Sequence, residues 1–373
     1  MEWNNKISEN VQAVPFSGIR KFFDLANQME GVISLGVGEP DYAAPARVID
    51  ACIESLKNKE TSYTSNWGLL ELREEISGLF KKRYGLEYDP MNEIMITVGV
   101  SEAITVVMQT ILNQGDQVLM PDPAYLAYPA CVRLVGGTPV LVPTFSDDEF
   151  KLRVDKLEEK LTTKTKALLI GYPNNPTGTV MDQAALEEIA AFAQRHDLIV
   201  ISDEIYCDLT YEGKHTCFAS IPGTKERTLV MNGFSKSYAM TGLRIGYICG
   251  PKEVMQSLYK VHQYEILCAA STSQYGAIAA LRKCDEDVKV MFDEYKIRRK
   301  IVYDALAKMG LKVFKPKGAF YIFPDISCTG MNDEEFCDRL LMEEKVGVVP
   351  GTCFGLQGKN HIRISYAASR ENL

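Results

Sequence analysis

Residues 233–246 read Gly233-Phe234-Ser235-Lys236-Ser237-Tyr238-Ala239-Met240-Thr241-Gly242-Leu243-Arg244-Ile245-Gly246. A lysine and an arginine lie here among small and apolar residues, which are unusual neighbours for charges on a solvated surface. Charged groups in such surroundings are usually paired with another group. An apolar run of strand length comes before the segment and another closes it, at Thr228–Asn232 and Ile245–Cys249. We therefore expect the segment to connect two buried strands, and we expect Lys236 and Arg244 to have partners.

Five further apolar runs of strand length come earlier in the chain, and most are separated by stretches long enough for a helix. Most of these runs show no alternation of polar and apolar residues, which is typical of strands buried on both faces. Such an order favours a largely parallel sheet covered by helices on both sides. The sequence therefore predicts a large α/β domain over residues 46–280, with a seven-stranded, mostly parallel sheet. The expected strands are Ile94–Val98, Gln117–Met120, Pro139–Val142, Ala167–Ile170, Leu198–Ser202, Thr228–Asn232 and Ile245–Cys249.

Residues 281–373 have a different pattern, in which helical stretches and short extended runs are mixed. The helical stretches are Asp285–Met309 and Asp333–Glu344, and the pattern predicts a smaller α+β domain. The first 45 residues contain several prolines and glycines and few helical periods, so we expect a segment that packs on other elements, chiefly those of the small domain. The extended runs of the small domain are Val313–Lys315, Ala319–Phe323, Val346–Val349 and His361–Ser365.

The composition of the chain excludes several classes of partner. The 373 residues include 41 Lys and Arg against 49 Asp and Glu, a formal net charge of −8. This balance gives no general attraction to nucleic acid or to anionic lipid. There is no signal-peptide pattern and no apolar run long enough to span a membrane, so we expect a cytoplasmic protein. The cysteines are expected to be reduced, and the spacing of the four histidines predicts no metal site.

The turn after Ile94–Val98 has two possible uses. Its sequence, Gly99-Val100-Ser101-Glu102-Ala103, resembles the nucleophile elbow of a hydrolase, with alanine in place of the second glycine. A hydrolase using Ser101 would need a histidine, and His262 or His361 is available, so this function remains a distant alternative. The other use is phosphate binding, because the first N–H groups of the following helix are unpaired and suit an anion.

Residues 233–246 match, position by position, the lysine signature of the class I/II pyridoxal-phosphate aminotransferases. The chain resembles this family along nearly its whole length, which implies the fold of type I pyridoxal-phosphate-dependent transferases. The resemblance also implies pyridoxal 5'-phosphate as the cofactor, held by Lys236 through a Schiff base. Burial lowers the pKa of a lysine, and a neutral amine is what Schiff-base chemistry requires.

Two further motifs resemble cofactor-binding segments of the family. In Tyr172-Pro173-Asn174-Asn175-Pro176-Thr177-Gly178, Asn175 would contact the phenolic oxygen of the cofactor and the substrate carboxylate. In Ser202-Asp203-Glu204-Ile205-Tyr206, Asp203 would contact the pyridine nitrogen and Tyr206 the phenolic oxygen. A carboxylate beside the ring nitrogen favours the protonated ring, which is the better electron sink. The resemblance thus implies Lys236, Asp203 and Tyr206 as catalytic residues.

The resemblance assigns the other cofactor contacts as well. Tyr125 matches the aromatic residue that stacks on the cofactor ring. Tyr63 resembles a tyrosine that reaches the cofactor phosphate of the neighbouring subunit, which implies a homodimer. The remaining phosphate contacts would come from Arg244, the Ser235 hydroxyl and backbone groups near Val100 and Ser101.

Arg363 matches the arginine that binds the substrate α-carboxylate, which a planar guanidinium can do through two parallel hydrogen bonds. Gly38 would let the amino-terminal segment approach the substrate, and Ile19 resembles a residue that lines the side-chain pocket. In one branch of the family, a lysine at the position of Ser101 recognises the second carboxylate of aspartate. This chain has no lysine there, which favours aromatic or broadly neutral substrates.

The expected function is the transfer of an amino group from an L-amino acid to a 2-oxo acid such as 2-oxoglutarate. Carbon–sulfur lyases share the fold and the lysine signature, so elimination remains an open alternative. The expected partners are small amino acids and oxo acids, together with a second copy of the chain.

Overall fold

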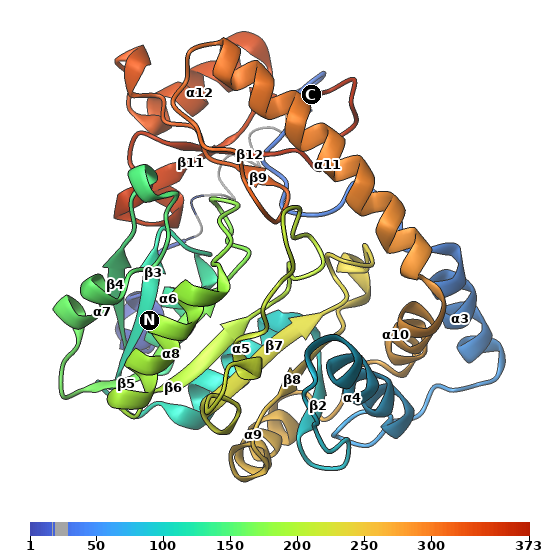
Figure 1. Ribbon diagram of the computed structural model, residues 1–373. Helices are drawn as coiled ribbons and strands as arrows, with labels where there is room; N and C mark the ends of the chain where they lie inside the picture. The colour runs from blue at the N-terminus through green and yellow to red at the C-terminus, as the bar shows by residue number, and fades with distance from the viewer. Residues whose placement is uncertain (17, 19–28) are drawn as a thin grey trace.

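A computed structural model describes residues 1–16, 18 and 29–373 of the chain. Its centre is a seven-stranded sheet with the order β2-β8-β7-β6-β5-β3-β4 (Figure 1). β8 is antiparallel to both of its neighbours, β2 and β7, and the other neighbouring pairs of this sheet are parallel. The strands are β2 (Ile94–Thr97), β3 (Gln117–Asp122), β4 (Thr138–Pro143), β5 (Thr165–Gly171), β6 (Ile199–Asp203), β7 (Thr228–Gly233) and β8 (Gly246–Cys249). All seven expected strands and the mostly parallel sheet are thus confirmed.

The direction of β8 follows from its connection to β7. Residues 234–245 join the two strands and contain only a short 3-10 turn, Thr241–Leu243. A parallel pair needs a crossover, usually through an α-helix, whereas an antiparallel pair can be joined directly. The connection that carries Lys236 therefore returns the chain beside the strand it has just left.

Helices cover both faces of this sheet (Figure 1). On β3, Val118 and Met120 pack into a cluster with α5, α6 and α9, whereas Leu119 packs into the opposite cluster with α7 and α8. This alternation follows from the two-residue period of a strand. The helices are α3 (Ala46–Lys57), α4 (Leu70–Tyr84), α5 (Gly99–Ile111), α6 (Ala127–Leu134), α7 (Val154–Lys160), α8 (Gln183–Arg195), α9 (Lys252–Glu265) and α10 (Ser271–Lys283).

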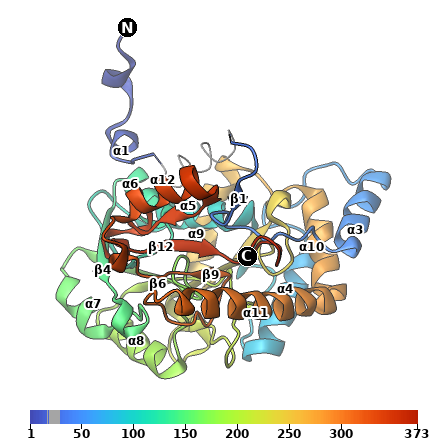
Figure 2. The same ribbon diagram turned by 90° about the horizontal axis from the view of Figure 1, so that it is seen from above.

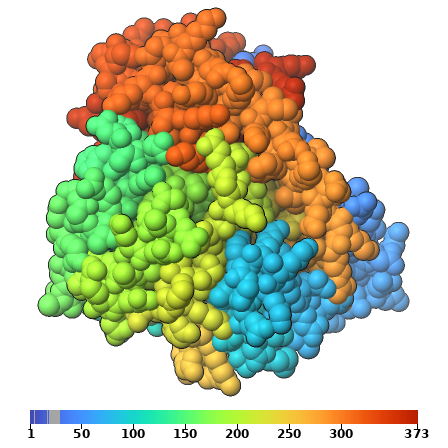
Figure 3. All heavy atoms as spheres, in the orientation of Figure 1, coloured from blue at the N-terminus to red at the C-terminus, as the bar shows by residue number. Residues whose placement is uncertain are grey.

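The C-terminal part lies above this sheet in Figure 1 and presses closely against it in the space-filling view of Figure 3. It contains the two helices expected from the sequence, α11 (Asp285–Lys308) and α12 (Asp333–Glu344). Its three-stranded antiparallel sheet has the order β11-β12-β9. These strands are β9 (Tyr321–Ile322), β11 (Val349–Pro350) and β12 (Ile362–Ser365).

Two details of the expected small domain are wrong. Val313–Lys315 is not a strand; Phe314 packs against Phe150 instead, and the following Pro316 has no N–H for a ladder. Val346–Val349 is not one strand, because β10 (Val346–Gly347) pairs with β1 (Ile33–Ser34), whereas β11 pairs with β12. A short run of apolar residues does not show that its two ends have different partners.

The amino-terminal segment reaches the C-terminal part through the parallel pair β1 and β10. Before it, the first residues project from the body of the molecule, and the short helix α1 (Glu9–Gln12) lies against α6 (Figure 2). The domain boundaries at residues 46 and 281 stay a prediction. In the part of the chain that the structure describes, no helix is long and apolar enough to cross a membrane.

Candidate active site

A cavity of about 650 Å³ lies where the parallel strands of the large sheet end, beside β12 of the C-terminal part. Ligands of open α/β sheets bind at this edge, outside the carboxyl ends of the strands. Asp203 is the last residue of β6, and Lys236 follows β7 closely. The cavity brings together these two residues with Gly38, Val100, Ser101, Tyr125, Asn175, Tyr206, Ser235, Arg244 and Arg363.

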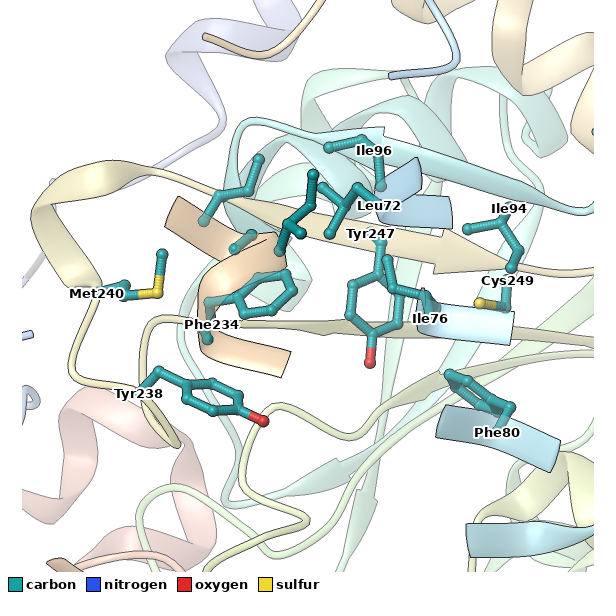
Figure 4. Close-up of a cluster of buried hydrophobic side chains, with 14 of the residues drawn as sticks. Leu72, Ile76, Phe80, Ile94, Ile96, Phe234, Tyr238, Met240, Tyr247 and Cys249 are labelled. Atoms are coloured by element: carbon teal, nitrogen blue, oxygen red, sulfur yellow. The ribbon is translucent and has the colours of Figure 1, made fainter. Parts of the chain in front are cut away.

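Lys236 is held by the residues on either side of it. Phe234, Tyr238 and Met240 bury their side chains in the cluster between the sheet and helices α4 and α10, as Figure 4 shows. Each such burial contributes about 1.5 to 3 kcal/mol of transfer free energy. The lysine itself is turned to the cavity, where Nζ donates to the carbonyl oxygen of Gly38 at 2.5 Å.

The surroundings of Lys236 favour a neutral amine. Burial is the main cause that lowers its pKa to about 8, and Arg363 and Arg244 act in the same direction. Glu39 and Asp203 oppose the shift, because a nearby carboxylate favours the protonated amine. A substantial fraction of Lys236 is therefore uncharged near neutral to mildly alkaline pH.

Asp203 is a buried carboxylate with two fixed hydrogen bonds. Its Oδ2 accepts from the Tyr128 hydroxyl at 2.8 Å, and its Oδ1 accepts from the backbone N–H of Ile205 at 3.2 Å. Burial raises the pKa of Asp203 to about 6, and both hydrogen bonds oppose this rise. The carboxylate thus keeps its charge at neutral pH and faces a cavity in which a cationic partner would be favoured.

Arg244 and the start of α5 form a cradle for an anion. The guanidinium Nη1 donates to the Thr241 carbonyl at 2.9 Å, and Nη2 donates to the Ser101 hydroxyl at 3.4 Å. Gly99 begins α5 with a φ of +70°, and a Cβ there would lie 2.7 Å from Nη2 of Arg244. Only glycine accommodates both this backbone conformation and this close approach. The first N–H groups of α5 therefore lie beside a cation at the cavity wall, which suits a phosphate.

Arg363 is a buried arginine on β12 with a fixed orientation. Nη1 donates to Oδ1 of Asn175 at 2.9 Å, and Nη2 donates to the carbonyl oxygen of Gly36 at 2.5 Å. The guanidinium lies 4.5 Å from the centre of the Tyr321 ring and 4.8 Å from that of Phe354. A buried cation held in this way is a strong site for a carboxylate.

Three further tyrosines complete the wall of the cavity. The hydroxyls of Tyr206 and Tyr321 are 2.8 Å apart, and both side chains are buried. Tyr125 is 37% exposed, and its ring meets that of Tyr128 edge to face at 5.5 Å. An accessible aromatic face at this place can stack on a planar ligand.

Comparison with protein families, curated proteins and solved structures identifies relatives of this chain. A family model described as aminotransferase class I and II matches residues 30–373. The chain belongs to the class I and II aminotransferases. Two relatives of the enzyme are 46% identical to it over 370 residues, which cover 98% of this chain and 95% of the relative. They are aromatic-amino-acid aminotransferase 2 of Thermococcus litoralis and an aspartate aminotransferase of Pyrococcus abyssi. The crystal structure of an aromatic aminotransferase from Pyrococcus horikoshii is 44% identical, with a TM-score of 0.90 over 95% of each chain.

The aminotransferase therefore has the family and the fold that its lysine segment predicts. Enzymes of this family depend on pyridoxal phosphate, and their reaction is transamination. Tyr63 is 83% exposed and outside the cavity, and Ile19 lies outside the described residues.

Sequence reasoning missed several residues that the aminotransferase places at the cavity. Tyr128 lies in α6, three residues after Tyr125, which precedes the helix, and its contact with Asp203 has no signal in the sequence. Tyr321 lies in a short apolar run and gave no signal beyond that of a buried strand. Glu39 was also missed, although its carboxylate accepts from the Thr241 hydroxyl at 3.0 Å and faces the cavity.

The hydrolase alternative finds no support in the geometry. Nδ1 of His262 lies 2.5 Å from Oε1 of Glu102, and both side chains are buried in the core. His361 stacks on Phe323 with ring centres 5.1 Å apart. Among the described residues, no histidine lines the cavity, so Ser101 has no base beside it.

Proposed function

We propose that the enzyme uses pyridoxal 5'-phosphate to move an amino group from a neutral L-amino acid, aromatic ones above all, to 2-oxoglutarate or a similar oxo acid. The observation that carries this proposal is that four ionisable side chains occupy separate positions in the cavity. These are the Lys236 amine, whose pKa is lowered to about 8, the buried carboxylate of Asp203, and the separate guanidinium groups of Arg244 and Arg363.

The residues of the cavity fit the cofactor. Arg244 and the start of α5 would hold its phosphate, and Asp203 its ring nitrogen. Tyr206 and Asn175 would contact its phenolic oxygen, while Tyr125 would lie against the ring. Ser235 and backbone groups near Val100 and Ser101 would add contacts to the phosphate. The cofactor supplies an electron sink for the carbon that loses its proton.

Lys236 supplies the amine and the proton carrier of the reaction. Burial lowers its pKa to about 8, so its Nζ becomes neutral at mildly alkaline pH rather than only above about pH 10. A neutral amine can bond to an aldehyde, and once released it can accept a proton and deliver it again. Its position on a connection anchored in the core limits the motion of Nζ, which favours transfer between two fixed atoms.

The positions of the cations support a neutral amino donor, whereas the distal carboxylate of 2-oxoglutarate, one methylene farther from the α-carboxylate than that of aspartate, would need a partner outside this set of residues, such as one from the second subunit. Among the described residues that line the cavity, the cations are Lys236, Arg244 and Arg363. If the first two serve the cofactor, Arg363 with Asn175 is left for the α-carboxylate, and no described cation faces a second carboxylate. The remaining wall includes the apolar or aromatic side chains of Val37, Ile104, Tyr125 and Leu126.

We further propose that the enzyme is a homodimer in which Tyr63 contacts the cofactor phosphate of the other subunit. Tyr63 is 83% exposed in the single chain. Ile49, Ile53 and Leu56 follow one face of α3 nearby in sequence, and each is 43% exposed or more. An exposed apolar face of this kind is typical of an interface between subunits. A sedimentation velocity run that gave only monomer would contradict this assembly.

A panel of amino donors with 2-oxoglutarate tests the reaction and the preference together. We expect phenylalanine and tyrosine to give kcat/KM values at least about tenfold above that of aspartate, since a second buried carboxylate without a cation is costly. Selectivity for aspartate would overturn the substrate assignment. Ammonia release without an oxo acid would instead indicate elimination and overturn transamination itself.

A further inference from the structure

Tyr321 lies between two parts of the cavity that the proposed function uses separately. It is the first residue of β9, and its side chain is fully buried. Its hydroxyl is 2.8 Å from that of Tyr206, and its ring centre is 4.5 Å from the guanidinium of Arg363. One side chain therefore touches both the residue assigned to the cofactor and the residue assigned to the substrate carboxylate.

We propose that Tyr321 is a positioning residue whose hydroxyl sets the hydrogen bond of Tyr206 and whose ring sets the plane of Arg363. This inference rests on the proposed function, because it assigns Tyr206 to the cofactor and Arg363 to the α-carboxylate. It adds that Tyr206 and Arg363 are both positioned by one side chain: the hydroxyl of Tyr321 acts on Tyr206, and its ring acts on Arg363.

The hydroxyl of Tyr321 can fix the direction in which the hydroxyl of Tyr206 donates its hydrogen bond. A phenol donates one hydrogen bond and can accept others. When Tyr206 donates its proton to a group in the cavity, its oxygen can accept the proton of Tyr321. Consecutive hydrogen bonds polarise one another, so the bond from Tyr321 strengthens the one that Tyr206 donates. Both side chains are buried, which limits competition from solvent for this pair.

The ring of Tyr321 acts on Arg363 in a different way. Nη1 and Nη2 of Arg363 each donate to a protein oxygen, but the buried Nε has no hydrogen-bond partner among the residues that the structure describes. The plane of the guanidinium is therefore not fully fixed by hydrogen bonds. The rings of Tyr321 and Phe354 lie against the guanidinium at 4.5 and 4.8 Å, and such contacts are attractive when desolvated.

Gly38 provides an independent way to move the hydroxyl of Tyr321. A Cβ at Gly38 would lie 2.8 Å from that hydroxyl oxygen and 3.9 Å from Nη1 of Arg363. The backbone of Gly38 is not in the left-handed region, so alanine is compatible with it. Gly38→Ala therefore presses on the hydroxyl of Tyr321 while it leaves the tyrosine itself in place.

The test compares Tyr321→Phe, Tyr321→Leu and Gly38→Ala with Tyr366→Phe as a matched control. Tyr366 belongs to the same buried cluster, and its hydroxyl donates to the Ala319 carbonyl at 3.1 Å, away from the cavity. Two properties of the holoenzyme are measured besides activity. One is the pH midpoint of the absorbance of bound pyridoxal phosphate, and the other is the Kd of 3-phenylpropionate, a carboxylate without an amino group, by calorimetry.

Tyr321→Phe should raise the pH midpoint by about half to one unit, because a weaker bond from Tyr206 stabilises the deprotonated form less. Its Kd for 3-phenylpropionate should stay within about twofold of the parent value, since the ring remains. Tyr321→Leu should show the same shift and also weaken this binding about tenfold. Gly38→Ala should raise the midpoint, and Tyr366→Phe should change neither property.

An unshifted midpoint in Tyr321→Phe and Gly38→Ala would overturn the role of the hydroxyl. Unchanged binding in Tyr321→Leu would overturn the role of the ring, as would an equal loss in Tyr321→Phe. Equal effects in Tyr366→Phe would reduce both roles to general packing. A parent protein that binds no pyridoxal phosphate would instead overturn the proposed function, so the two failures are distinguishable.

Discussion

The hydroxyl of Tyr128 donates a 2.8 Å hydrogen bond to Oδ2 of Asp203, and both side chains are buried at the wall of the cavity. Burial raises the pKa of Asp203 to about 6, and the bond from Tyr128 opposes that rise. A hydrogen bond to the ionised form favours ionisation. Tyr128 therefore helps Asp203 to remain a carboxylate at neutral pH, which the proposed contact with a protonated ring nitrogen requires.

Replacing Tyr128 with phenylalanine should make the enzyme more sensitive to acid. Asp203 carries its charge above its pKa and loses it as the pH falls. Without the bond from Tyr128 the pKa rises further, so the acid limb of kcat/KM should move upward by about one pH unit. A pH–rate profile measures this shift. Tyr88→Phe is the control, because the buried hydroxyl of Tyr88 has no hydrogen-bond partner within the described part of the chain; equal shifts in both variants would refute the role of Tyr128.

Gly171→Ala should have a similar effect without touching the tyrosine. Gly171 ends β5, and a Cβ there would overlap the hydroxyl of Tyr128. Alanine should therefore displace the hydroxyl from Asp203, and crowding of a packed site costs about 1 to 3 kcal/mol. We expect the acid limb of kcat/KM to move in the same direction as in Tyr128→Phe, with a lower Tm. A variant with a normal pH profile would show that the hydroxyl tolerates the added methyl group.

Arg363→Lys should weaken substrate binding more than it slows the chemical step. A lysine keeps the charge but cannot form two parallel hydrogen bonds to a carboxylate. Loss of one charge-assisted bond should raise KM for the amino donor about 10- to 100-fold. Steady-state kinetics with phenylalanine measures the change. Arg370→Lys is a suitable control, because Arg370 is exposed and pairs with Glu294; a KM that rises only in the control would refute the assignment.

The rate at which the apoenzyme captures pyridoxal phosphate should follow the titration of Lys236. The pKa of Lys236 is lowered to about 8, chiefly by burial. Only the neutral amine reacts, so the rate should rise with pH, pass its midpoint near pH 8 and level off above it. Stopped-flow absorbance measures this rate, with free Nα-acetyl-lysine as the reference. A rate that rises in parallel with that of the free amino acid would show that the site does not lower the pKa.

The large sheet could be predicted from the sequence because its strands carry their own signal. Ala167–Ile170 is apolar throughout and Thr228–Asn232 has an unbroken apolar centre, as is typical of strands buried on both faces. The small domain was harder, because Val346–Val349 is one apolar run whose ends pair with different strands. Which strand each end of the run pairs with depends on the positions of β1 and β12, and the residues of the run carry no information about these positions.

The candidate site shows the same limit. Lys236, Asp203 and Arg363 could be predicted because each belongs to a motif with several fixed positions. Tyr128 and Tyr321 could not, since their roles depend on contacts with residues distant in the chain. The hydroxyl of Tyr321 meets that of Tyr206 only because β9 and the end of β6 face the same cavity.

The covalent bond to Lys236 is the central claim, and reduction tests it directly. The purified enzyme would be incubated with pyridoxal phosphate, reduced with borohydride, digested and examined by mass spectrometry. We expect a stable phosphopyridoxyl group on the peptide that contains Lys236, and none on any peptide of Lys236→Ala. A label on a different lysine, or an unlabelled chain, would contradict the account.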